Sequence, residues 1–136
     1  MKLFKGIVKT GIGKAVLEMS KSSELDEWET LTGMRVIPGT LNLQLTKPFD
    51  LSLLRYLSFS KIGWDFDPAT QGFDFKGDIG MYYNRIIIAG KYRGILVFWT
   101  WVPELDTHAE LISQVHLRTT LGLEDGDIVD FSLYAY

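Results

Sequence analysis

Apolar residues alternate with polar ones, or form short continuous runs, in several segments of the 136-residue chain. Both patterns are typical of β-strands, the first of half-buried strands and the second of fully buried ones. Two continuous runs, at 86–89 and 95–98, predict strands that are buried on both faces. The strands predicted in this way cover residues 4–8, 15–19, 41–45, 62–66, 81–89, 94–101 and 128–134.

Helical signals are fewer and shorter. Ser22 can act as an N-cap, because acidic residues occupy the following turn, and Gly33 is placed to end the helix. Leu25 and Trp28 share one face of that helix. The remaining segments are predicted as a short helical or irregular stretch at 48–56, a hairpin connection at 72–80, and short helical turns at 108–113 and 116–121.

Many short strands with regular turn signals and few helices indicate an all-β protein, either a barrel or a sandwich, with small helical insertions. A closed barrel covered by loops and helices would bury its strands on both faces, which is what the apolar runs require. The chain shows no internal repeat, low-complexity tract or interdomain linker. We therefore expect a single domain over residues 1–136, a common length for one domain.

The composition narrows the possible functions. The net charge is −3, so neither nucleic acid nor an anionic membrane is an expected partner. The chain contains no cysteine, which excludes disulfides, thiolate catalysis and zinc–thiolate sites. No signal-peptide core can be built from the N-terminal residues, and the longest apolar stretch, 94–102, is far too short to span a bilayer. We expect a cytoplasmic protein.

The most informative segment is 38–43, Pro-Gly-Thr-Leu-Asn-Leu. Pro38 restricts φ and Gly39 permits a tight turn, after which a strand begins. Thr40 and Asn42 lie two positions apart along this strand, so their side chains point to the same face. Two neutral oxygens beside an open turn suit a hydrated hard cation or a phosphate. The alternative is an ordinary turn entering a strand, in which both side chains make local hydrogen bonds.

A second candidate is the loop 10–14, Thr-Gly-Ile-Gly-Lys, which follows the first predicted strand. Glycines let backbone N–H groups approach phosphates, and Lys14 adds a positive charge. The spacing matches neither the Walker pattern nor a complete dinucleotide-binding fingerprint. An ordinary hairpin turn is the alternative for this loop.

The remaining candidates lie in the last third of the chain. One of them is Glu110, which has His108 close by. The alternative to a functional role is that Glu110 is an exposed carboxylate and His108 a solvated imidazole. Arg118 could hold a phosphate or cap a helix. His108 and His116 lack the one-turn spacing of paired helical metal ligands, and no third ligand is evident. The Asp-Gly-Asp run at 125–127 predicts a tight turn.

In order and approximate spacing, these segments resemble the archaeal-type CTP-dependent riboflavin kinases, which are small cradle-loop β-barrels. The pattern of that family runs from a first strand into a glycine loop, then a helix ending in Gly, then Pro-Gly-Thr-Leu-Asn-Val/Leu. A Glu-Ile-Ile segment, Leu-Arg and a Leu-x-Asp-Gly-Asp-x-Val ending follow much later. The corresponding segments of this chain are 6–13, Gly33, 38–43, 110–112, 117–118 and 123–129. The resemblance implies a six-stranded cradle-loop β-barrel.

The resemblance also implies an activity, which is transfer of the γ-phosphate of CTP to the 5′-hydroxyl of riboflavin, giving FMN and CDP with Mg²⁺ as the metal. The metal site would fall on Thr40 and Asn42. Glu110 would be the catalytic carboxylate that orients or deprotonates the hydroxyl, and His108 would join it in binding the substrate. The nucleotide-binding loop would consist of Thr10, Gly11, Ile12, Gly13, Lys14 and Ala15.

The chain departs from the family pattern inside this loop, where Lys14-Ala15-Val16 stands in place of Glu-Gly-Arg. The change alters the nucleotide cradle and leaves an alternative open, namely a non-catalytic module that binds a flavin or a nucleotide on the same barrel. A DNA-binding barrel, as in the related swapped-hairpin proteins, is disfavoured by the acidic net charge and the lack of a basic stripe.

Overall fold

The computed structural model describes residues 2–10 and 22–134 of the chain. The strands are β1 (Phe4–Lys9), β2 (Leu41–Leu45), β3 (Arg55–Ser58), β4 (Gly80–Ile88), β5 (Tyr92–Trp99), β6 (His108–Ser113) and β7 (Ile128–Leu133). The helices are α2 (Ser22–Thr32), α3 (Phe59–Ile62) and α4 (Leu117–Leu121), with the 3₁₀ turns η1 (Leu51–Leu53), η2 (Pro68–Gln71) and η3 (Leu105–Thr107). Within these described ranges, no helix has the length and apolar character that crossing a membrane requires.

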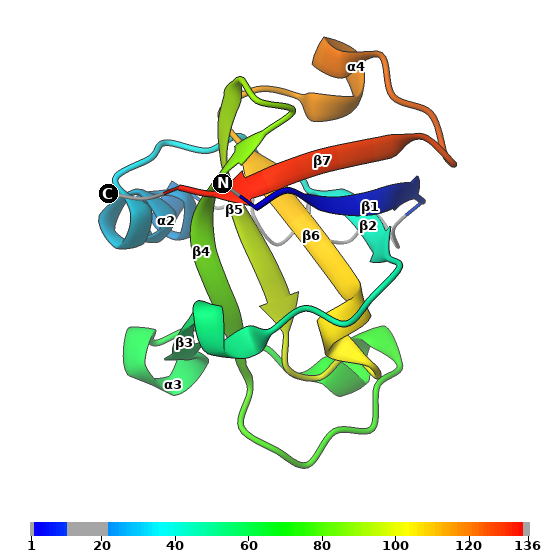
Figure 1. Ribbon diagram of the computed structural model, residues 1–136. Helices are drawn as coiled ribbons and strands as arrows, with labels where there is room; N and C mark the ends of the chain where they lie inside the picture. Colours follow the sequence, from blue (N-terminus) through cyan, green and yellow to red (C-terminus); the bar gives the residue numbers. More distant parts are fainter. Residues whose placement is uncertain (1, 11–21, 135–136) are drawn as a thin grey trace.

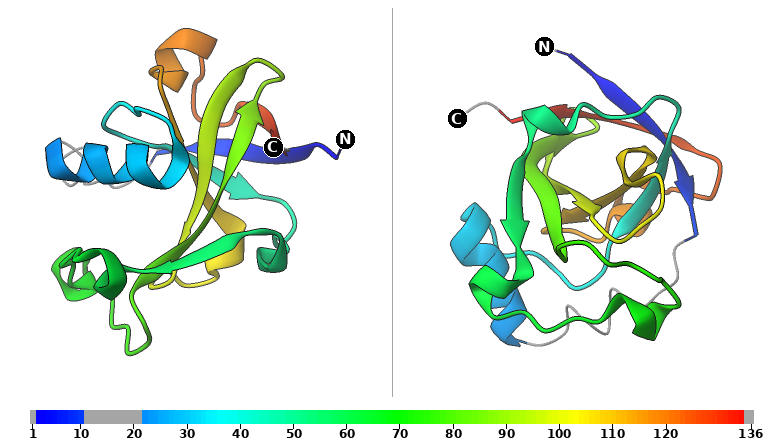
Figure 2. Two further views of the ribbon diagram at one scale, coloured as in Figure 1. Left: turned by 90° about the vertical axis from the view of Figure 1, so that its left-hand side faces the viewer. Right: turned by 90° about the horizontal axis from the view of Figure 1, so that it is seen from below.

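Six strands close into an antiparallel β-barrel, and β3 lies outside it (Figure 1 and Figure 2). The order around the barrel is β4-β5-β6-β2-β1-β7. The barrel closes because β4 is long enough to serve two neighbours on one side. Its first residues pair with β3, and its last residues, from Ile86 to Ile88, pair with β7. The predicted six-stranded barrel is therefore confirmed.

Two hydrophobic layers cover the two faces of the barrel wall. The barrel interior is filled by side chains from all six barrel strands, among them Val8, Leu43, Ile88, Leu96, Leu111 and Phe131. An outer layer covers part of the other face, where Ile95 and Val97 of β5 and Ile112 of β6 pack in one cluster with Trp28 of α2. The run 95–98 of β5 is thus buried on both faces, as its sequence predicts, whereas in the run 86–89 Ile86 and Ile88 are buried, Ile87 is half-buried and Ala89 is exposed.

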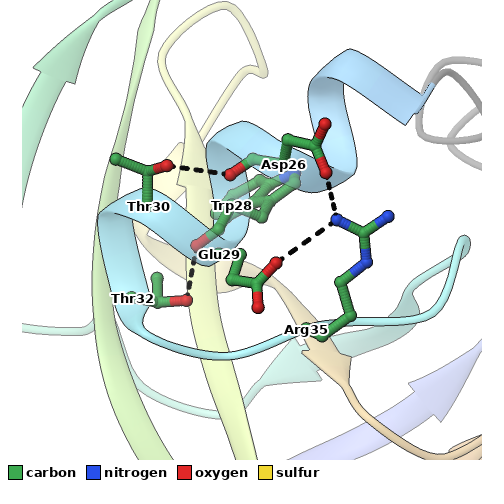
Figure 3. A network of polar contacts seen from close by, with 6 residues as sticks. All are labelled: Asp26, Trp28, Glu29, Thr30, Thr32 and Arg35. Carbon is green, nitrogen blue, oxygen red and sulfur yellow. Dashed lines mark hydrogen bonds and ion pairs between the residues drawn. The ribbon is translucent and has the colours of Figure 1, made fainter.

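Helix α2 is attached to the outer layer by Trp28, which is 1% exposed. Gly33 ends the helix with a φ of 72°, as expected for the residue after a helix C-terminus. In the next segment, the guanidinium of Arg35 reaches back to the carboxylates of Asp26 and Glu29 (Figure 3). These contacts hold the segment between α2 and β2 against the helix, and this segment contains the Pro-Gly-Thr turn.

The prediction of a helical turn at 108–113 is wrong, because this segment is strand β6. His108 and Glu110 alternate with Ala109 and Leu111, which point into the barrel and are buried. A segment of only six residues with this pattern is compatible with both helical and strand periodicity when the rest of the chain is not considered. The segment is a strand because β2 and β5 both offer it a hydrogen-bonding partner.

The prediction of a strand at 62–66 is also wrong. Gly63 adopts a φ of 70° and caps α3, and the N–H of Trp64 bonds to the carbonyl of Phe59. Trp64 and Phe66 alternate with polar residues because they pack against the outer layer, without joining a ladder. The hairpin connection predicted at 72–80 is consequently part of a longer connection between β3 and β4.

The other predictions agree with the structure where it describes them. Strands β1, β2, β4, β5 and β7 and helices α2 and α4 lie where the sequence patterns predict them, within a few residues at each end. Strand β3 occupies the end of a stretch that was expected to be helical or irregular, of which only η1 is helical. The strand predicted at 15–19 lies outside the described residues.

Candidate functional site

Five polar side chains meet on the outer face of the barrel where β1, β2 and β6 lie side by side. In the ladder, Lys9 of β1 pairs with Asn42 of β2, which in turn pairs with Glu110 of β6. One step along, Gln44 of β2 pairs with His108 of β6. Residues directly opposite each other in an antiparallel sheet point to the same face. We name these five residues, together with Thr40, the polar row.

Thr40 enters the polar row from the turn that precedes β2. Gly39 has a φ of 107°, a conformation that favours glycine, and the N–H of Ile37 bonds to the carbonyl of Ser113 at 3.0 Å. The turn is therefore tied to the end of β6. From this position the hydroxyl of Thr40 donates a hydrogen bond to Oε1 of Glu110 at 2.7 Å.

Asn42 is the second residue of β2 and a member of the polar row. The residue is half-buried, and its side chain makes no hydrogen bond within residues 2–10 and 22–134. It lies two positions after Thr40 and directly across from Glu110. The shared face that the sequence predicts for Thr40 and Asn42 is therefore present, and the carboxylate of Glu110 completes it.

The carboxyl group of Glu110 is largely withdrawn from solvent. Burial raises its pKa, while hydrogen bonds from Thr40 and Trp99 and the positive charge of Lys9 act in the opposite direction. Its neighbour across the β5–β6 ladder is the fully buried Val97. A carboxylate with a raised pKa is suited to accept a proton near neutral pH.

Lys9 and His108 interact directly. Nζ of Lys9 donates to Nδ1 of His108 and, at 3.5 Å, to Oε1 of Gln44. Burial lowers the pKa of Lys9, against the charge of Glu110. Burial and then the charge of Lys9 lower the pKa of His108, against the charge of Glu104.

A cleft of about 110 Å³ opens beside Thr40, between the Pro-Gly-Thr turn and the start of α4. Arg118 lines it, and its guanidinium donates to the carbonyl of Lys9 at 3.2 Å and to the carboxylate of Asp125 at 2.5 Å. The hydroxyl of Thr10 donates to the same carboxylate. The end of β1, where the glycine loop begins, is thereby fastened next to the cleft.

An aromatic group lies in the outer layer on the β5 side of Glu110. The rings of Trp99 and Trp101 are stacked with centroids 5.3 Å apart, and Phe66 lies 4.6 Å from Trp101. Phe59 meets Trp101 edge-on at 5.7 Å. Phe59 and Trp101 are buried in this group, whereas Trp99 and Phe66 are half-buried and could offer ring area to a planar aromatic ligand.

The donor set of the polar row suits a hard cation that retains other ligands. The described part of the chain contains no group of three or more His, Asp or Glu side chains that could hold a metal ion by themselves. Thr40 and Asn42 instead offer neutral oxygens beside a single carboxylate. Mg²⁺ commonly binds in this way, with water and substrate phosphates supplying the rest of its coordination.

The structure brings together Thr40, Asn42, His108 and Glu110 from the predicted site. Thr10 follows Lys9 directly after the end of β1, and its hydroxyl is bonded to the carboxylate of Asp125. The other predicted nucleotide-binding residues, Gly11, Ile12, Gly13, Lys14 and Ala15, lie outside the described residues. Sequence reasoning missed Lys9 and Gln44, because their only signal is the ladder register that places them across from Asn42 and His108.

The chain is similar to known proteins of one family. Residues 8–133 match the model of the CTP-dependent riboflavin kinase family, which is also described as a domain of unknown function, DUF120. A riboflavin kinase of Methanothermobacter thermautotrophicus is 28% identical over 126 residues, covering 93% of this chain and 94% of that protein. A riboflavin kinase of Pyrobaculum calidifontis is 32% identical over 133 residues, covering 95% of this chain and 58% of that protein. A riboflavin kinase of Methanobrevibacter smithii is 27% identical over 124 residues, covering 91% of this chain and 94% of that protein.

Proposed function

The chain belongs to the CTP-dependent riboflavin kinase family, and we propose that it transfers the γ-phosphate of CTP to the 5′-hydroxyl of riboflavin. One observation carries the proposal beyond family membership. The hydroxyl of Thr40, the carboxamide of Asn42 and the carboxylate of Glu110 lie together on one half-buried face, beside an open cleft. Phosphoryl transfer depends mainly on such positioning and on charge neutralisation.

Thr40 and Asn42 would hold Mg²⁺ through their side-chain oxygens. Bound there, the ion would neutralise charge on the phosphates of the nucleotide. The hydroxyl of Thr40 can do so while its proton remains directed at Oε1 of Glu110. The same hydrogen bond fixes the carboxylate relative to the ligand set.

Glu110 would be the catalytic base. Thr40 donates to its Oε1 and Trp99 also donates to the carboxylate, and a remaining lone pair of the carboxylate would accept the proton of the 5′-hydroxyl. The hydroxyl oxygen then forms the new bond to the γ-phosphorus, the bond from that phosphorus to the bridging oxygen breaks, and CDP leaves. The raised pKa of Glu110 supports this role, because it brings the carboxylate closer to the pKa of an effective base at neutral pH.

The two substrates would approach from opposite sides of the polar row. CTP would extend from the glycine loop, from Thr10 to Ala15, into the cleft beside Arg118. Riboflavin would place its isoalloxazine ring against the half-buried Trp99, which Trp101 supports from beneath by stacking, with His108 near the ribityl chain. The aromatic group supports this arrangement because it borders the face of β6 that carries Glu110.

A turnover assay tests the proposal. Purified protein is incubated with riboflavin, Mg²⁺ and each of CTP, ATP, GTP and UTP, and FMN is separated by chromatography. We expect FMN with CTP, and we expect Asn42→Ala to lower kcat by about 10²-fold or more without changing the thermal melting curve. Asn84→Ala, in which a carboxamide is removed from β4, serves as the matched control.

Two results would contradict the proposal. The first is a failure of the wild-type protein to produce FMN from any of the nucleotides. Binding of riboflavin or CTP in calorimetry without turnover would then favour the non-catalytic module, for which Lys14-Ala15-Val16 in the glycine loop is the motivation. The second is full activity of Asn42→Ala, which would remove Asn42 from the site.

A further inference from the structure

We propose that Lys9 binds the phosphoryl group in transit, with His108 and Gln44 holding its ammonium in position. The proposal rests on the proposed kinase function and adds a residue that neither the sequence patterns nor the family resemblance indicates. Lys9 would be a catalytic residue, since it touches the reacting group. His108 and Gln44 would be positioning residues, since they act through Lys9.

The position of Lys9 in the ladder is the first support. It pairs with Asn42, the residue proposed to hold the metal, and Asn42 pairs with Glu110, the proposed base. The three side chains therefore form one row across three strands, at the usual strand spacing of about 5 Å. A phosphoryl group between nucleotide and hydroxyl would have to pass over this row.

The second support is that the ammonium of Lys9 is held by neutral acceptors. An ammonium only donates, so Nδ1 of His108 must accept, which makes the imidazole neutral with its proton on Nε2. The amide of Gln44 donates through Nε2 to the carbonyls of Thr107, at 3.3 Å, and Leu45, at 3.4 Å. Its Oε1 is thereby turned toward Lys9. Two of the three N–H groups of Lys9 have partners among residues 2–10 and 22–134, and the third would be available to a ligand.

The third support is electrostatic. Within the two described ranges, the ion pairs join Arg35 to Asp26 and Glu29 and Arg118 to Asp125, and no carboxylate lies within ion-pairing distance of Lys9. The charge of Glu110 acts on Lys9 only from two strands away, so the half-buried ammonium is incompletely compensated, which is costly. An incoming phosphate would supply the missing negative charge, and in a partly desolvated site the interaction is stronger than in water.

A comparison of FMN with riboflavin as ligands tests this assignment without requiring turnover, because the two differ only in the phosphate. Affinities are measured by calorimetry or by quenching of flavin fluorescence. For Lys9→Met we expect FMN affinity to fall about 10-fold or more, as for loss of a charge-assisted contact, while riboflavin affinity stays within about twofold. In turnover we expect kcat to fall about 10²-fold, with little change in the KM for riboflavin.

Lys5→Met is the matched control, since Lys5 lies on the same strand and the same face, pairs with Asp130 of β7, and is exposed. We expect it to leave both affinities unchanged. For the positioning role, His108→Leu should reduce the preference for FMN, and His108→Gln, which retains an acceptor, should restore part of it. Thermal melting of each variant shows whether the fold is retained.

The assignment is overturned if Lys9→Met retains the FMN affinity of the wild type, or if riboflavin and FMN weaken equally, which would indicate a purely structural role. Its failure is distinguishable from failure of the kinase proposal. If the wild-type protein binds both flavins and makes no FMN, the kinase proposal fails, while the ratio of the two affinities in Lys9→Met still decides the role of Lys9.

Discussion

The hydroxyl of Thr40 donates a hydrogen bond of 2.7 Å to the carboxylate of Glu110, although 70 positions of sequence separate the two residues. The bond joins the turn before β2 to the middle of β6. It orients the carboxylate proposed as the base and, at the same time, the hydroxyl proposed as a metal ligand. The two roles therefore depend on a single contact.

Loss of the hydrogen bond between Thr40 and Glu110 is predicted to lower the stability of the fold. We expect Thr40→Val to lower the free energy of unfolding by about 1–3 kcal/mol, because a largely buried carboxyl group loses its donor, and Thr40→Ser to recover most of it. Urea denaturation measures the change. Thr30→Val is the control, since the hydroxyl of Thr30 is exposed and bonds only within α2. A Thr40→Val variant as stable as Thr30→Val would contradict the importance of the bond.

Trp28 is predicted to be the main attachment of α2 to the barrel. It is 1% exposed and packs in the outer layer with Trp64, their ring centroids 5.7 Å apart. We expect Trp28→Ala to cost about 3–5 kcal/mol of unfolding free energy, and Trp28→Phe clearly less, because the cavity is smaller. Leu53→Ala, at a residue that is 45% exposed, should change stability by no more than about 0.5 kcal/mol. A Trp28→Ala variant within that limit would show that α2 is not held by this side chain.

The imidazole of His108 should titrate below its usual pKa of about 6.5, because burial and the charge of Lys9 both disfavour its protonated form. NMR titration of the ring nitrogens measures the value. In Lys9→Met we expect the pKa of His108 to rise, since one of the two causes is removed. The lowered pKa also affects stability. Because the folded-state pKa of His108 lies below its unfolded-state value, the neutral imidazole stabilises the fold fully above the unfolded pKa, and this contribution is lost as the pH falls. An unchanged pKa in Lys9→Met would contradict the direct contact.

Asp78 should make stability depend on pH in the acid range. Hydrogen bonds from Tyr56 and then from Ser58 lower the pKa of Asp78. A carboxylate with a lowered folded-state pKa stabilises the fold above its unfolded pKa of about 4 and loses that effect as the pH falls. The difference in melting temperature between the wild type and Asp78→Asn should therefore be constant at neutral pH and shrink below about pH 4. A difference that stays constant down to pH 2 would contradict the lowered pKa.

The hydrogen bond between Tyr56 and Asp78 should also make stability depend on pH in the alkaline range. Burial and the hydrogen bond to Asp78 raise the pKa of Tyr56 to about 12. An acid with a raised folded-state pKa stabilises the fold below its unfolded pKa of about 10, and this contribution is lost as the pH rises toward the folded value. Tyr56→Phe tests the same hydrogen bond, because it removes the hydroxyl that donates to Asp78. The stability of this variant should therefore depend less on pH in the acid range than that of the wild type, as expected for Asp78→Asn.

The strands that sequence periodicity predicted best are those whose two faces are both covered. The apolar run 95–98 of β5 is the clearest case, since both of its sides pack against apolar neighbours. The wrong predictions concern two segments, 62–66 and 108–113, whose pattern of apolar and polar side chains is compatible with more than one structure. Trp64 and Phe66 alternate like a strand because both pack on the outer layer, and His108 to Leu111 are too few to separate a helical period from a strand.

Local chemistry along the chain determined the Pro38-Gly39 turn, the end of α2 at Gly33 and the common face of Thr40 and Asn42, because each depends on a few consecutive residues. Only the tertiary structure decided that Glu110 faces Thr40 and that Lys9 joins Asn42. Those neighbours are set by ladder register, which depends on how six strands close into a barrel, and no short segment contains that information.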